Sequence, residues 1–136
     1  MRDDAAFHSW LELLVEGNRA WCKHASTFIM VIAKKTFDFN GQPSRTHAFD
    51  AGAACENLAL EGTRRGFVIH AMEGFDYEKA KEILKIPDDH EVMCMVAVGK
   101  RGEVDLLPKK IRKAEKPTSR KSLAKIVFKE TFGNPL

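Results

Sequence analysis

Hydrophobic positions along the chain alternate between helical spacing and short continuous apolar runs. The first pattern predicts an amphipathic helix over residues 5–15, with an apolar face made of Phe7, Trp10, Leu11, Leu14 and Val15. Gly17 and Asn18 are expected to break this helix, and residues 19–23 predict another helical turn. Residues 26–33 form an apolar, partly β-branched run, which predicts a buried strand in the middle of a sheet.

A second helical segment, residues 48–65, is the feature around which we expect the fold to be organised. Small and apolar side chains recur along one stripe of it, at Ala51, Ala54 or Cys55, Leu58 and Gly62. Gly52 and Gly62 would each cost about 1 kcal/mol relative to alanine in an exposed helix. Close packing against another backbone would offset that cost, so this helix is predicted to be buried.

Turn residues and two further apolar runs complete the pattern. Residues 34–46 contain Asn-Gly and Pro-Ser turn signals. Gly66 is expected to end the central helix in a left-handed conformation, and residues 67–72 predict a strand that ends at Glu73 and Gly74. The remaining predicted elements are a helix capped by Asp76 and running to Lys85, a strand over 92–98, a polar connection over 100–118 and a helix over 119–130. This order indicates an α+β fold with helices layered on three strands, in one domain spanning residues 1–136.

Charge is unevenly distributed, although the net value is only +3. From Lys100 onward, 11 Lys and Arg residues against 4 Asp and Glu residues give +7, whereas 11 minus 15 gives −4 before it. Such a basic stretch can bind phosphate on a nucleotide cofactor, on nucleic acid or on an anionic partner, but a solvated surface is its commonest explanation. Nucleic acid ranks last, because the stretch lacks interleaved aromatic residues and a recognisable motif. We therefore expect no nucleic-acid partner.

Cysteine and histidine positions argue against metal or disulfide chemistry. Cys22, Cys55 and Cys94 lie in apolar segments without the spacing of metal ligands, so neither a zinc site nor a disulfide framework is predicted. His70, on an apolar run, is expected to be a core or interface histidine rather than a catalytic one. The absence of a signal peptide and of an apolar run of roughly 18 residues leads us to expect a soluble, cytoplasmic protein without a membrane partner.

Several short motifs together resemble the flavin-dependent nitroreductase family in their order and spacing. They are GNRAW at 17–21, D-x-G-x-A from Asp50, GFVIHAM at 66–72, EGFD at 73–76, LKIP at 84–87, AVG at 97–99 and PTSRKSL at 117–123. The resemblance implies a nitroreductase-like three-layer α/β/α sandwich and an intertwined homodimer built around the central helix. The family's N-terminal Arg-rich phosphate-binding motif and Asn-Gln-Pro-Trp-like flavin contact have no match here, so we expect a fold truncated at its N-terminus.

The resemblance also implies FMN as cofactor, NAD(P)H as electron donor and a nitroaromatic or quinone-like small molecule as acceptor. The residues it assigns to the flavin ring are Ala71 and Met72 through packing and Glu73 and Gly74 through their backbone; those it assigns to the phosphate are Ser119, Arg120 and Lys121. Taken without the resemblance, Glu73 and Gly74 also suit a purely structural turn, and residues 119–121 suit the capped start of a solvated basic helix.

A non-catalytic protein is the alternative to an enzyme. The unmatched N-terminal motifs would have supplied charge-assisted hydrogen bonds to FMN worth about 1.5–3 kcal/mol each. Losing two or three of them could lower flavin affinity by several orders of magnitude. The alternative is therefore a truncated nitroreductase-like homodimer, or a partner subunit, with weak or no flavin binding.

Overall fold

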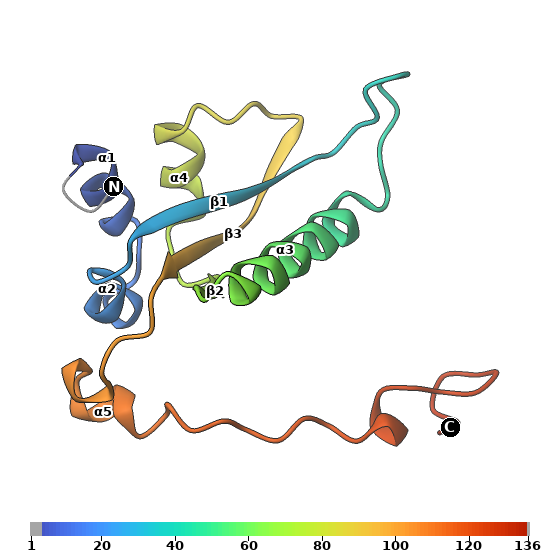
Figure 1. The fold of residues 1–136 in the computed structure, drawn as a ribbon. Coiled ribbons are helices and arrows are strands. Elements are labelled where there is room, and N and C mark those ends of the chain that lie inside the picture. The colour runs from blue at the N-terminus through green and yellow to red at the C-terminus, as the bar shows by residue number, and fades with distance from the viewer. Residues whose placement is uncertain (1–3, 136) are drawn as a thin grey trace. The chain divides into compact units, whose positions relative to one another are not determined.

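A computed structural model describes residues 4–135, which form two compact units divided between Glu103 and Val104 (Figure 1). The elements of the first unit are α1 (Ala5–Leu11), α2 (Glu16–Cys22), β1 (Thr27–Lys34), α3 (His47–Arg64), β2 (Val68–Met72), α4 (Tyr77–Ile83) and β3 (His90–Gly99). Those of the second unit are the 3-10 turn η1 (Val104–Leu106), the short helix α5 (Lys109–Arg112) and the 3-10 turn η2 (Leu123–Lys125).

The three strands form an antiparallel sheet in the order β1-β3-β2. Met30 and Met72 both pair with Met95, so these three side chains lie on the same face of the sheet. The prediction that the first strand is central is wrong for the described sheet. Strand β3 occupies the middle because both earlier strands pair with it, and its apolar run is accordingly the most completely buried.

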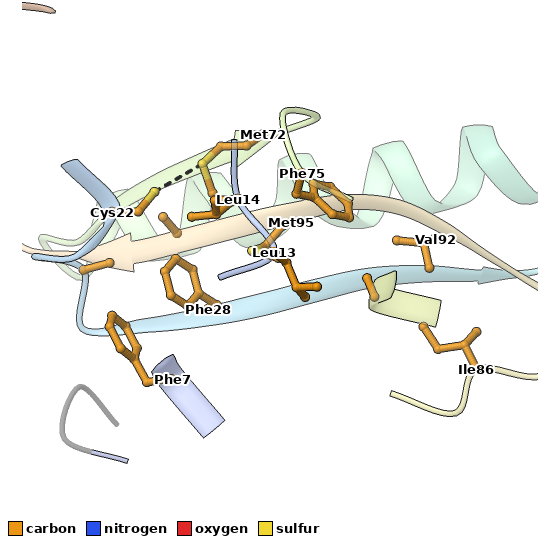
Figure 2. Packing of buried hydrophobic residues seen from close by; sticks show 13 residues of the cluster. Phe7, Leu13, Leu14, Cys22, Phe28, Met72, Phe75, Ile86, Val92 and Met95 are labelled. Atoms are coloured by element: carbon orange, nitrogen blue, oxygen red, sulfur yellow. Dashed lines mark hydrogen bonds between the residues drawn. The ribbon is translucent and has the colours of Figure 1, made fainter. Parts of the chain in front are cut away.

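Helices cover both faces of this sheet, as the predicted three-layer α/β/α arrangement requires. One face carries the main hydrophobic core (Figure 2), whose buried members are Phe7, Leu13, Leu14, Cys22, Ala25, Phe28, Met72, Phe75, Ala80, Ile86, Val92, Met95 and Ala97. These residues come from α1, α2, α4, the three strands and the segments that connect them. Helix α3 packs across β1 and β2 on the opposite face, where it covers Val96.

Helix α3 is buried along one stripe only. Ala51, Cys55 and Leu58 are half-buried on the sheet side, and Gly62 is fully buried. A Cβ added at Gly62 would lie 2.5 Å from Cδ1 of Ile69, so close packing does explain this glycine. The outward face is exposed in the single chain, so the prediction of a buried helix is confirmed for this stripe and wrong for the opposite face. A Cβ at Gly52 would meet no atom of the described chain within 4 Å.

Tertiary contacts shorten the predicted first helix. Helix α1 ends at Leu11 rather than at Val15, because Leu13 and Leu14 turn into the core and bond to the segment that follows β2. The Asp76 N–H donates to the Leu13 carbonyl at 2.9 Å. Gly17 and Asn18 consequently lie inside α2 and do not break a helix.

Local turn and cap predictions are confirmed in the first unit. Gly66 follows α3 with φ +75°, and the Asp76 carboxylate accepts a hydrogen bond from the Lys79 N–H at 2.9 Å, at the start of α4. The segment 35–46 forms a turn closed by a bridge between Thr36 and Pro43.

The second unit contradicts the predicted final helix. Residues 119–122 are non-helical, and only Leu123–Lys125 form a single 3-10 turn. The predicted apolar face, Leu123, Ile126 and Val127, remains exposed or nearly so and buries too little surface to stabilise a short helix. No helix within residues 4–135 is both long and apolar enough to cross a membrane.

Candidate functional site

Strand β2 places Ala71 and Met72 on opposite faces of the sheet, since side chains alternate along a strand. Met72 is buried, with 5% of its surface exposed, and its Sδ accepts a hydrogen bond from the Cys22 Sγ at 3.4 Å (Figure 2). Ala71 is exposed. A planar ring resting on the Ala71 side chain would therefore not touch the Met72 side chain, which belongs to the core.

The turn after β2 is held from two directions. The Phe75 N–H donates to the Glu73 carbonyl at 2.9 Å, which makes a three-residue turn centred on Gly74. The Gly74 carbonyl accepts hydrogen bonds from the Val15 N–H at 3.0 Å and from the Asn18 Nδ2 at 3.1 Å. A Cβ at Gly74 would lie 2.5 Å from the Asn18 Nδ2, so glycine is needed here for the close approach of α2.

Two backbone donors of this turn are unengaged. Within residues 4–135, the N–H groups of Glu73 and Gly74 donate to no acceptor of the chain. Backbone N–H groups without a partner are uncommon unless water or a ligand satisfies them. The end of β2 therefore presents two neighbouring hydrogen-bond donors beside the exposed Ala71.

Aromatic side chains surround the turn. Phe75 is buried and stacks on Tyr77, with ring centroids 4.1 Å apart. Burial raises the pKa of the Tyr77 hydroxyl, and the nearby Glu73 carboxylate raises it further, so this hydroxyl stays protonated at neutral pH. The His70 ring lies 4.7 Å from that of Trp21 on α2. His70 is exposed, so the prediction of a core histidine is wrong and an interface role stays a prediction.

The cysteines are poor candidates for nucleophilic chemistry. All three are free thiols. Burial raises the pKa of the Cys22 thiol to about 12. Burial, and then the neighbouring Cys55, raise the pKa of the Cys94 thiol to about 11. Because the thiolate is the reactive form, Cys22 and Cys94 are nearly inert at neutral pH. The described residues also contain no group of three His, Cys, Asp or Glu side chains able to hold a metal ion.

Ser119, Arg120 and Lys121, the predicted phosphate-binding residues, belong to the second unit. All three are exposed and lie in a segment without helix or strand. They do not begin a helix, so the predicted capping by Ser119 and the attraction of an anion to a helix N-terminus are absent. Their role in binding phosphate stays a prediction based on residue type alone.

Asn18 and Arg19 make tertiary contacts that the sequence did not predict. The Arg19 guanidinium donates to the carbonyls of Glu12 and Leu14, at 3.2 and 3.0 Å, and thereby fixes the link between α1 and α2. Asn18 fixes the turn after β2. The sequence feature that could have indicated these contacts is the pair of polar residues near Trp21, in the segment that precedes an apolar strand.

Comparison with known proteins agrees with this architecture. The sequence profile described as the nitroreductase family matches residues 2–100. The chain belongs to the nitroreductase family. An uncharacterized 15.4 kDa protein from the ask 5′ region of Mycolicibacterium smegmatis is 33% identical over 134 residues, which are 98% of this chain and 88% of that protein.

Solved structures extend the family assignment to the fold. A crystal structure described as the oxidoreductase containing FMN is 34% identical, with a TM-score of 0.91 over 98% of this chain and 69% of that one. A nitroreductase family protein from Streptococcus pneumoniae TIGR4 has a TM-score of 0.69 at 18% identity, over 93% of this chain and 75% of that one, and supports the fold alone. The nitroreductase fold of this chain is thus established.

Proposed function

We propose that this nitroreductase-family chain is an FMN-dependent oxidoreductase that takes electrons from NAD(P)H and reduces nitroaromatic or quinone-like acceptors. Family membership and the 34% identical FMN-containing oxidoreductase support the cofactor. The observation that carries the proposal is the pair of unengaged N–H groups of Glu73 and Gly74 beside the exposed Ala71.

The residues at this edge suit the isoalloxazine ring of FMN. When bound, FMN supplies the hydride chemistry, and the protein supplies position and electrostatics. The Glu73 and Gly74 N–H groups would donate hydrogen bonds to acceptor atoms of the ring, and the small Ala71 side chain would leave room for a flat surface. Met72 would contribute through its backbone and through the core that supports the strand, since its side chain is buried.

A homodimer is part of the proposal. The outward face of α3 exposes Phe49 (77%) and Leu60 (61%), with the small residues Gly52 and Ala53 between them. The small residues allow another backbone to approach closely, and the large apolar side chains on either side of them supply the surface that it would bury. A second copy of α3 is the partner that the resemblance to the family favours.

The visible absorption spectrum of the full chain, before and after incubation with FMN and removal of the excess, tests the cofactor. We expect flavin absorbance near one FMN per chain and, with that protein, oxidation of NADH or NADPH dependent on a nitroaromatic or quinone. A chain that stays colourless, and whose mass in solution is that of a dimer, would instead support the non-catalytic homodimer.

A further inference from the structure

We infer that Asn18 is a positioning residue for the flavin-binding turn: its side-chain amide holds the Gly74–Phe75 peptide, whose Phe75 N–H engages the Glu73 carbonyl and so directs the free Gly74 N–H toward the ligand. This inference rests on the proposed FMN site. It adds Asn18 of α2 to the residues of that site, although the Asn18 side-chain amide donates its hydrogen bond to the Gly74 carbonyl and not to the cofactor.

Peptide geometry links the Asn18 contact to the free donors. In a trans peptide the N–H and C=O groups point in opposite directions, and the described chain contains no cis peptide. The Glu73 carbonyl is engaged by the Phe75 N–H, so the Gly74 N–H on the same peptide must point away from the turn. The next peptide, Gly74–Phe75, is held through the Gly74 carbonyl, which accepts from both Val15 and Asn18, and its own N–H is the Phe75 donor that engages the Glu73 carbonyl. Asn18 therefore acts on the direction of the Gly74 N–H through the hydrogen bond from Phe75 to Glu73.

The Asn18 side chain can be changed without removing the backbone hydrogen bonds that join the segment leading into α2 to the turn after β2. The other bonds joining the two segments, from the Asp76 N–H to Leu13 and from the Val15 N–H to Gly74, are made by backbone atoms and do not involve the side chain of residue 18. Within residues 4–135, the Asn18 amide makes the one side-chain hydrogen bond to the Glu73–Gly74 turn. Removing it leaves α2 and β2 in place but leaves the Gly74 carbonyl with a single donor.

The carbonyl of Gly74 needs both donors for its orientation to be fixed. A single hydrogen bond lets the peptide rock about that contact, whereas two donors from different directions hold it. A typical hydrogen bond contributes about 0.5–1.5 kcal/mol, which corresponds to an equilibrium change of roughly two- to twelvefold. Loss of the amide should therefore weaken FMN binding measurably without unfolding the protein.

The test compares Asn18→Ala and Asn18→Leu with Asn40→Ala in the full chain. Ala shortens the side chain and Leu keeps its size, so either variant suffices if the other fails to fold. Asn40 is the matched control, because its Oδ1 accepts a hydrogen bond from the Gln42 N–H at 2.9 Å in the turn after β1. The readouts are FMN dissociation constants by fluorescence quenching, the midpoint potential of bound FMN, and amide exchange of Phe75 without FMN.

We expect both Asn18 variants to bind FMN about three- to tenfold more weakly, to exchange the Phe75 amide several times faster and to shift the midpoint potential, with Asn40→Ala unchanged in all three. A purely structural role would weaken both redox forms of FMN equally and leave the potential unmoved. An unmoved potential, an unchanged dissociation constant, or the same losses in Asn40→Ala would each overturn the inference alone. A wild-type chain that does not bind FMN would overturn the proposed function and this inference with it.

Discussion

Substitution of the two glycines of α3 by alanine separates helix propensity from packing. Both lie inside the same helix, so alanine should stabilise each by roughly 0.5–1 kcal/mol through the helix term alone. At Gly52 no other segment of the same chain lies within 4 Å of the new methyl group, so that gain should appear in full in the monomer, at low protein concentration. At Gly62 the methyl group would stand 2.5 Å from Cδ1 of Ile69, and overpacking of this kind costs about 1–3 kcal/mol.

The difference between the two variants isolates the packing cost, because the helix term is common to both and cancels. We expect Gly62→Ala to be less stable than Gly52→Ala by about 1–3 kcal/mol, or by at least about 4 °C in melting temperature for a domain of this size. Urea and thermal unfolding should be followed at several protein concentrations, so that any contribution from association is separated. Equal stability of the two variants at every concentration would refute the packing argument and the position of α3 on β2.

Three further predictions concern phosphate binding, pH and thiol reactivity. Arg120→Ala should leave the unfolding midpoint unchanged and weaken FMN binding by about ten- to a hundredfold, as expected for the loss of a charged hydrogen bond. Titration with riboflavin, which lacks the phosphate, should give the same dissociation constant for wild type and variant. The hydrogen bond to the Ser44 carbonyl, and then the Glu91 carboxylate, raise the pKa of His47. The stabilisation that His47 provides relative to His47→Gln should thus be complete below the unfolded-state pKa of about 6.5 and fall as pH rises through the higher folded-state pKa. Urea unfolding at pH 5.5–8.5 would contradict this if the difference in free energy of unfolding between wild type and variant increased with pH. Cys22, whose pKa burial raises to about 12, should resist iodoacetamide at pH 7.5 in the native protein and react fully in urea, and rapid native alkylation seen by mass spectrometry would disprove its burial.

The candidate site was only partly accessible to sequence reasoning. The turn at Glu73 and Gly74 was placed correctly at the end of a strand, because glycine after an apolar run is a local signal. The buried state of Met72 depends on which face of β2 meets α2, and the pairing with β3 decides that. Asn18 could not be assigned, since its acceptor lies 56 residues away in the chain.

By itself the sequence determined the elements whose signals are local. The three apolar runs became strands, Asp76 capped α4, and Gly66 ended α3 in a left-handed conformation, because each depends on side-chain chemistry within a few residues. Tertiary structure decided the rest. Burial of Leu14 ended α1 early, pairing with two partners placed β3 in the middle, and the lack of a surface to bury left residues 119–122 non-helical. These outcomes depend on contacts between distant segments, whose free energies of burial and pairing exceed the small intrinsic preferences of single residues.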